Sequence, residues 1–245
     1  MSPRATAAAP RRSALRRHFS REPSLLTSLL LVFPLFLFYQ LGVLFTPTLN
    51  GADLITRPLQ GLMRHNLGAY LLLSGVLTIA FIVVALVLRR RQDFDWRLFV
   101  PVLLESAIYA LTMGSLINLI MNPLARHLAT GIANAGLFDR VIMSFGAGVH
   151  EELLFRLILL SGILAVLHRV LRFPRWLAVA IAFVISSLLF SLAHHVGPYG
   201  EPLQLGVFTY RFLAGLIFAT LFYFRSFAIA VYTHALYDVY VMVLR

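Results

Sequence analysis

Long uninterrupted apolar runs alternate along this chain with short polar connections that are rich in arginine and proline. Each run is about twenty residues or longer, and a helix of that length crosses the hydrocarbon core of a bilayer. None shows the two-residue alternation that is typical of a membrane β-strand. The pattern therefore predicts transmembrane helices at about 24–45, 69–88, 98–121, 141–167, 176–195, 204–224 and 227–244.

The composition agrees with this pattern. Hydrophobic residues make up 60% of the chain and the mean hydropathy is +0.84, values that exclude an ordinary soluble domain. In lipid, only helices and closed barrels satisfy their backbone hydrogen bonds internally. We therefore expect an all-α fold, a polytopic helical membrane protein with about seven transmembrane helices. Cysteine is absent, which excludes disulfides, thiolate metal ligands and a cysteine nucleophile.

The charged residues predict the orientation of the helices. The net charge is +11 and all 21 basic residues are arginines, most of them clustered between the apolar runs. This distribution follows the positive-inside rule and argues against a nucleic-acid partner. With a cytoplasmic N-terminus, fourteen arginines lie on the cytoplasmic side and six on the other, with Arg156 buried. Arginine without lysine is typical of a GC-rich bacterial genome, so we expect an integral protein of the bacterial inner membrane.

The fourth apolar run contains charged residues, each of which costs about 2.5–3.5 kcal/mol on insertion scales. Glu152 and Arg156 are four apart on a helix with the acid first, an order that favours an ion pair. Glu151 is turned about 100° away from Glu152 and lacks that partner. The spacing indicates a structural role for Glu152 and leaves Glu151 available for chemistry.

Two later helices carry further polar side chains in the membrane interior. His194 closes the fifth predicted helix, with Phe190 one turn before it, and His234 and Asp238 share one face of the seventh. Acid, base and hydrogen-bonding groups from separate helices are what a buried catalytic site requires. His150 is ambiguous between a catalytic and a packing role. Polar residues at helix ends, where water is near, are His168, His195, Glu105, Asn118 and Arg211.

Taken in order, three motifs resemble those of the CAAX-protease and bacteriocin-processing family of intramembrane glutamic endopeptidases. They are Glu151-Glu152-x-x-x-Arg156, Phe190-x-x-x-His194 and His234-x-x-x-Asp238. The resemblance covers residues 141–244, which we expect to be the catalytic core. The helices within 24–121 carry no motif and are assigned as accessory spans of the same membrane domain, 24–245. Residues 1–23 are polar and basic, and we expect a disordered cytoplasmic tail there.

The resemblance implies a role for each motif residue. Glu151 would act as general base on a water, assisted by His194. His234 and Asp238 would hold the oxyanion or orient the water. Many family members have asparagine in place of Asp238, and an ionised aspartate cannot donate a hydrogen bond, so its oxyanion role requires a protonated carboxyl. Otherwise Asp238 would serve to orient His234. The supporting residues are Glu152, Arg156 and Phe190.

Alternatives to this chemistry stay open. Peptide hydrolysis needs a general base with a pKa near ambient pH and donors aimed at the tetrahedral oxygen. The chain has neither a His-Glu-x-x-His pair nor a Gly-x-Ser-x-Gly elbow. We expect no cofactor, yet Glu151, His194 and His234 would also make a zinc site with one open position. The alternative outside enzymes is a non-enzymatic peptide-immunity factor or membrane scaffold.

The predicted depth of the site bears on its substrate. Glu151 lies about 15 Å from the outer end of its helix, and His194 lies at the outer end of its own. We therefore expect the site to open toward the outer half of the membrane. It would cut a membrane-anchored or exported protein near its C-terminal or transmembrane segment, as in the myxosortase-like sorting proteases of the family. The expected partners are this protein or peptide substrate and the lipid bilayer.

Overall fold

The structure is a computed structural model that describes residues 24–46, 66–92, 94–121, 136–196 and 200–244. Within these ranges, helices are joined by turns and irregular connections, and no strand occurs in them. The predicted tail at 1–23 lies outside the described residues. In chain order the elements are α2 (Leu25–Gly42), η1 (Val43–Phe45), α4 (Leu67–Arg89), η2 (Trp96–Leu98), α5 (Phe99–Met121), α6 (Leu137–Glu152), η4 (Leu153–Leu160), α7 (Ser161–Ala165), η5 (Val166–Val170), α8 (Arg175–Ala193), α9 (Leu205–Phe224), α10 (Phe227–Val239) and η6 (Tyr240–Leu244).

The predicted fold class is confirmed. Among the described residues, 6 helical stretches are long and apolar enough to cross a membrane, and they start within a few residues of the predicted positions. The seventh predicted span corresponds to a shorter apolar helix, Phe227–Val243. The protein is a polytopic helical membrane protein. Its division into accessory and catalytic helices stays a prediction.

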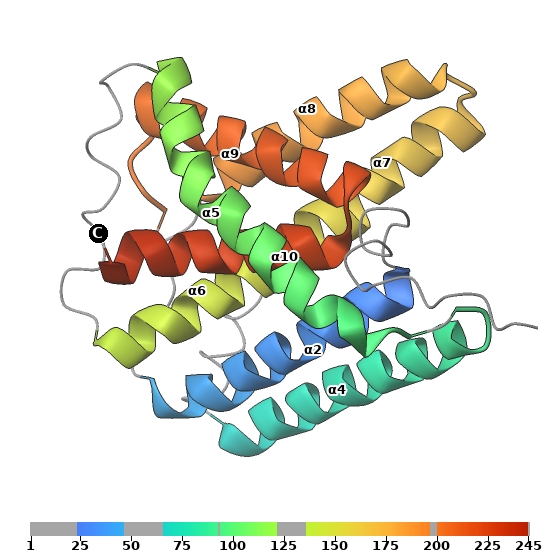
Figure 1. Ribbon diagram of the computed structural model, residues 1–245, viewed down its shortest axis with the longest axis vertical. Helices are drawn as coiled ribbons and strands as arrows, with labels where there is room; N and C mark the ends of the chain where they lie inside the picture. Colours follow the sequence, from blue (N-terminus) through green and yellow to red (C-terminus); the bar gives the residue numbers. More distant parts are fainter. Residues whose placement is uncertain (1–23, 47–65, 93, 122–135, 197–199, 245) are drawn as a thin grey trace, which may run out of the picture.

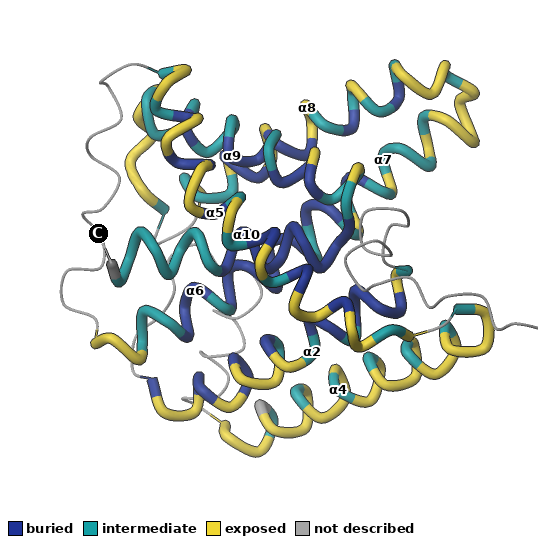
Figure 2. Tube along the Cα trace, in the orientation of Figure 1, coloured by how far each residue is buried: buried dark blue, intermediate teal, exposed yellow. Residues whose placement is uncertain are grey.

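The helices run in alternating directions around α10 (Figure 1). This helix contacts α6, α5, α9 and α2, whereas α4 packs against α2 on the outside of the bundle. Figure 2 shows the consequence: the middle of the bundle is buried, and α4 is exposed along most of its length. The end of α4, the connection from η5 to α8 and the turn from α9 to α10 all lie on the right of Figure 1. The arginine-rich connections therefore share one side of the bundle.

The fourth span is longer than predicted and changes its winding. It runs from Leu137 to Val170, compared with the predicted 141–167. The α-helix α6 ends at Glu152 and continues as the π-helix η4, in which Arg156 lies. Such wider turns are rare and occur often at functional sites. No local pattern of apolar residues predicts this change.

Small residues allow close contacts along α6. A Cβ atom added to Gly148 would lie 2.8 Å from the backbone nitrogen of Ala235 on α10. One added to Gly146 would overlap the ring of Tyr39 on α2. Small residues are the usual means by which membrane helices approach closely. Here they draw two neighbours, α10 and α2, tightly against the helix that carries the glutamate pair.

Glu105, near the start of α5, forms an ion pair that was not predicted from the sequence. Arg225, in the turn between α9 and α10, donates to both carboxylate oxygens of Glu105, over 2.6 and 2.9 Å. Tyr109 donates a further hydrogen bond of 2.9 Å to the same carboxylate. This pair ties α5 to the turn that starts α10.

Candidate active site

Glu151 and Glu152 are the last two residues of α6, directly before the helix changes its winding. The Glu152 Oε2 and Arg156 Nε atoms are 3.1 Å apart, and both side chains are completely buried. The structure therefore contains the ion pair that the four-residue spacing predicts. A charge pair without access to water is retained only where further contacts compensate for its lost hydration.

Those contacts come from two neighbouring helices. Arg156 Nη2 donates a 3.2 Å hydrogen bond to the carbonyl of Gly215 on α9. The guanidinium carbon lies 4.4 Å from the ring centroid of Phe190 on α8 and 5.6 Å from that of Phe218 on α9. Cations over aromatic faces are stabilised by the ring quadrupole, most strongly where water is excluded. Arg156 thus joins η4, α8 and α9 behind the glutamate pair.

His234, midway along α10, links this ion pair to the rest of the site. Its Nδ1 atom donates to Glu152 Oε1 over 2.8 Å, because a carboxylate can only accept. Its ring stacks on Phe218 with a centroid distance of 4.4 Å. The other nitrogen, Nε2, faces Asp238 Oδ2 at 3.6 Å and Glu151 Oε2 at 3.9 Å. The ring is held in place by one hydrogen bond and one aromatic face.

His194 is held in a similar way at the end of α8. It follows the last residue of that helix, and its Nδ1 atom lies 2.8 Å from the carbonyl oxygen of Phe190. A carbonyl accepts, so Nδ1 carries the proton and Nε2 of the neutral ring is free to accept. This Nε2 atom lies 3.6 Å from Glu151 Oε2. The four-residue spacing of the second motif thus sets the tautomer of its histidine.

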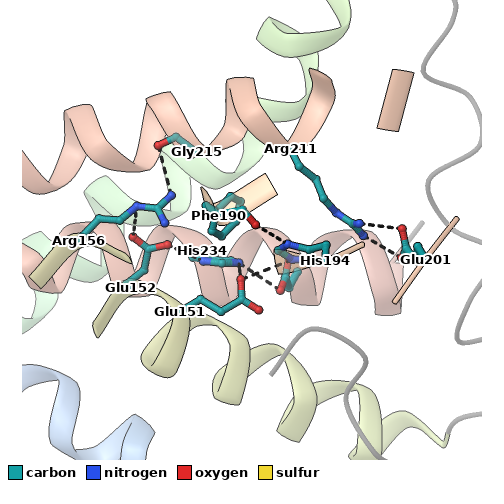
Figure 3. A network of polar contacts seen from close by, with 10 residues as sticks. Glu151, Glu152, Arg156, Phe190, His194, Glu201, Arg211, Gly215 and His234 are labelled. Carbon is teal, nitrogen blue, oxygen red and sulfur yellow. Dashed lines mark hydrogen bonds and ion pairs between the residues drawn. The ribbon is translucent and has the colours of Figure 1, made fainter. Parts of the chain in front are cut away.

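The site residues of the three motifs therefore meet in one network (Figure 3). Side-chain exposure rises from 4% at Glu151 through 6% at His234 and 10% at His194 to 17% at Asp238. The network is thus enclosed around Glu151 and opens on the side of His194 and Asp238. Glu151 Oε2 lies 3.6 Å from His194 Nε2 and 3.9 Å from His234 Nε2, and both distances are too long for a direct hydrogen bond. In each pair, a water molecule could lie about 2.8 Å from both atoms and bridge them.

The other histidines considered from the sequence lie outside this network. His150 is buried, and its Nδ1 atom contacts the carbonyl of Gly146 at 3.0 Å. His168 contacts the carbonyl of Phe173 at 3.0 Å, next to the connection to α8. Each of these rings has a local main-chain partner, which agrees with a packing role.

Sequence reasoning missed one ion pair next to the network. Arg211 was assigned to a helix end near water, but it forms two parallel hydrogen bonds with Glu201, at 2.7 and 2.8 Å. Figure 3 shows this pair beyond His194. In the sequence, Glu201 precedes Arg211 by ten residues. This spacing predicts no contact, because Glu201 lies in the connection before the helix that carries Arg211.

The zinc alternative concerns the same side chains. Among the residues that the structure describes, no group of three or more His, Asp or Glu side chains has the arrangement of a metal site. Nevertheless, Glu151, His194 and His234 each present an oxygen or nitrogen atom to a common region. These are the three side chains that would hold a zinc ion in that alternative.

A polytopic helical bundle that buries paired carboxylates and histidines from separate helices has the features of an intramembrane hydrolase. Residues 132–240 match the model of one protein family, described as type II CAAX prenyl endopeptidase Rce1-like. All residues of the three motifs lie inside this range. Over this stretch the chain matches the CAAX-protease family, as the motifs predicted, and the protein is a membrane protease. No curated protein and no solved structure gave a match.

Proposed function

We propose that the protein is a metal-free glutamic protease in which Glu151 activates the attacking water. One observation carries this assignment: a single oxygen, Glu151 Oε2, lies 3.6 Å from His194 Nε2 and 3.9 Å from His234 Nε2. Glu152, by contrast, is occupied by Arg156 and His234. Of the adjacent glutamates Glu151 and Glu152, Glu151 is thus the one that faces the shared water position.

The protons of the water can be followed atom by atom. One O–H of the water points to Glu151 Oε2 and the other to His194 Nε2, which accepts because Nδ1 carries the ring proton. Glu151 takes the first proton as the water oxygen bonds to the carbonyl carbon of the substrate. It then returns this proton to the leaving nitrogen as the C–N bond breaks. General-base catalysis of this kind contributes about 10²–10⁴-fold to the rate.

His234, as an imidazolium, is the donor that we assign to the developing oxyanion. Its Nδ1–H is used by Glu152, and Nε2–H, which faces the carboxylates of Glu151 and Asp238, is left for the oxygen. The position of the imidazole ring is fixed by the bond to Glu152 and by the stacked ring of Phe218, so little reorganisation is needed when the charge appears. Asp238 Oδ2 lies 3.6 Å from the same Nε2 atom. We assign Asp238 to the orientation of His234, since an ionised carboxylate would repel the oxyanion.

The substrate that we propose is a membrane-anchored or exported protein, cut near its C-terminal or transmembrane segment. Asp238 and His194, the more exposed members of the network, lie toward the ends of α10 and α8 that are remote from the arginine-rich connections. With those connections in the cytoplasm, the site opens toward the outer half of a bacterial inner membrane. Removal of a C-terminal anchor, as in a sorting protease, fits that position.

The test uses a co-expressed, tagged membrane protein that wild-type cells shorten. Such substrates can be found by comparing the membrane proteins of cells carrying wild type and Glu151→Gln, because uncut anchors accumulate in the variant. Cleavage is then measured for wild type, Glu151→Gln and His194→Ala, each with and without a zinc chelator. Loss of cleavage in both variants, with no effect of the chelator on wild type, supports the proposal. Loss with the chelator reassigns Glu151, His194 and His234 as zinc ligands, and shortening that persists in Glu151→Gln refutes the assigned base.

A further inference from the structure

An ion pair outside the three motifs lies at the open side of the network. Arg211, on α9, donates from Nη1 and Nη2 to the two carboxylate oxygens of Glu201, at 2.7 and 2.8 Å. The arginine side chain is 18% exposed and the glutamate 49% exposed. Two parallel hydrogen bonds from a guanidinium to a carboxylate fix the geometry of both partners. A paired arginine at this place has no part in the chemistry described so far.

The main chain of Glu201 connects this ion pair to the histidines at the end of α8. Its N–H donates a 3.0 Å hydrogen bond to the carbonyl of His194. Its own carbonyl lies 3.1 Å from Nδ1 of His195. One residue, Glu201, is thus bound by Arg211 through its side chain and holds the His194 main chain through its backbone.

His194 needs such support because it lies just beyond the helix. The last carbonyls of a helix have no partner within it, and they must be satisfied from outside. For His194 that partner is the N–H of Glu201. A second link between the same two helices is the 2.7 Å hydrogen bond from Ser191 Oγ on α8 to the carbonyl of Phe208 on α9.

We propose that Glu201 and Arg211 form a positioning pair that holds His194 against Glu151. Without the pair, the end of α8 would loosen, and the 3.6 Å separation between His194 Nε2 and Glu151 Oε2 would no longer be fixed. The guanidinium also interacts electrostatically with His194 and Asp238, so it contributes a positive charge to the open side of the network. The inferred consequence for catalysis rests on the proposed role of His194, whereas the positioning itself does not.

The positioning can be tested without a cleavage assay. Full-length protein in lipid vesicles is treated with diethyl pyrocarbonate, which modifies histidine rings, and modification of each histidine is followed by mass spectrometry with fragmentation. In Arg211→Gln and in Glu201→Gln we expect His194 to react about tenfold faster than in wild type, a change equivalent to about 1.4 kcal/mol. His234, which is held by Glu152, is expected to react at its wild-type rate.

The matched control is a second bidentate ion pair among the described residues, Glu105 with Arg225, which lies away from the network. Arg225→Gln should leave the reactivity of His194 unchanged. The exchanged pair, Glu201→Arg with Arg211→Glu, should restore slow modification because the two bonds can form again in reverse. Arg211→Lys, which keeps the charge but not the planar fork, should react at an intermediate rate.

Cleavage by the same preparations then separates the two proposals. Where wild type cleaves a substrate, Arg211→Gln should lower kcat about tenfold with little change in KM, equivalent to about 1.4 kcal/mol. Faster modification of His194 in a protein that cleaves nothing would uphold the positioning pair and refute the proposed chemistry. An unchanged reactivity of His194 in both single variants, or an equal increase in Arg225→Gln, would overturn the positioning pair.

Discussion

Replacing Gly148 by alanine should disable the protease while leaving it folded, because this glycine sets the distance between α6 and α10. The added Cβ would lie 2.8 Å from the Ala235 backbone nitrogen and Cβ and 3.0 Å from its Cα. Backbone atoms cannot move aside as the end of a side chain can. Non-bonded carbon atoms prefer about 3.5–4.0 Å, so the two helices must separate by about 1 Å.

The same separation acts on the site next to it. The hydrogen bond from His234 Nδ1 to Glu152 Oε1 measures 2.8 Å and crosses the interface between these helices. Lengthened by about 1 Å, it would exceed the range of a hydrogen bond. Misplacement by this amount costs about 10²-fold in rate. Overpacking costs about 1–3 kcal/mol of stability, of which the better helix propensity of alanine returns about 1 kcal/mol.

The assay compares Gly148→Ala with Gly162→Ala, which lies on the same span and would place its Cβ in open space, with nothing within 4 Å. Both variants gain the same helix propensity, so they differ only in whether the added methyl group meets Ala235 on α10. Cleavage of a tagged membrane substrate is measured per folded molecule, and folding is checked by thermal unfolding in detergent. We expect a loss of about 10²-fold for Gly148→Ala and wild-type activity for Gly162→Ala. Equal activity of the two variants would refute the importance of the α6–α10 distance.

Three further changes test other parts of the structure. Arg156→Gln leaves the buried Glu152 charge with only its hydrogen bond from His234 and should lower stability by about 3–5 kcal/mol. The double variant with Glu152→Gln should recover part of that loss in thermal unfolding. Ser186→Ala removes one buried hydrogen bond to the main chain and should cost about 1 kcal/mol in the same measurement, with cleavage unchanged. Because the chain lacks cysteine, single cysteines introduced at Leu171 and Leu203 report the orientation of the helices. A membrane-impermeant thiol reagent should label Leu171→Cys from the cytoplasmic side and Leu203→Cys from the opposite side. Labelling of both positions from the same side would contradict the predicted spans.

The helices were predictable from the sequence because the bilayer imposes their length and composition. The apolar runs located every described span to within a few residues, including the shorter helix that carries His234. The ion pair between Glu152 and Arg156 followed from helical spacing alone. In these cases the interacting residues are close in the chain, so local geometry is sufficient.

The remaining features depend on contacts between distant segments, for which local spacing carries no signal. The approach of Gly148 to Ala235 and the partner of Glu105 both arise from how helices pack. Arg211 was expected to reach water because it lies near a helix end, and its two hydrogen bonds to Glu201 were therefore not predicted. The convergence of the histidines on Glu151 was expected through the family resemblance, because spacing within each motif does not relate one helix to another.

The central claim is that Glu151 is the base, and the most direct test compares two buried glutamates changed in the same way. Glu151→Gln and Glu105→Gln each replace a carboxylate by an amide of the same shape, and the rate of substrate cleavage is measured per folded molecule in metal-stripped vesicles. We predict that Glu151→Gln loses about 10²–10⁴-fold in rate while its thermal midpoint is retained. Glu105→Gln should lose stability, since it breaks the bond to Arg225, and keep its rate. Cleavage by Glu151→Gln at close to the wild-type rate would contradict the account.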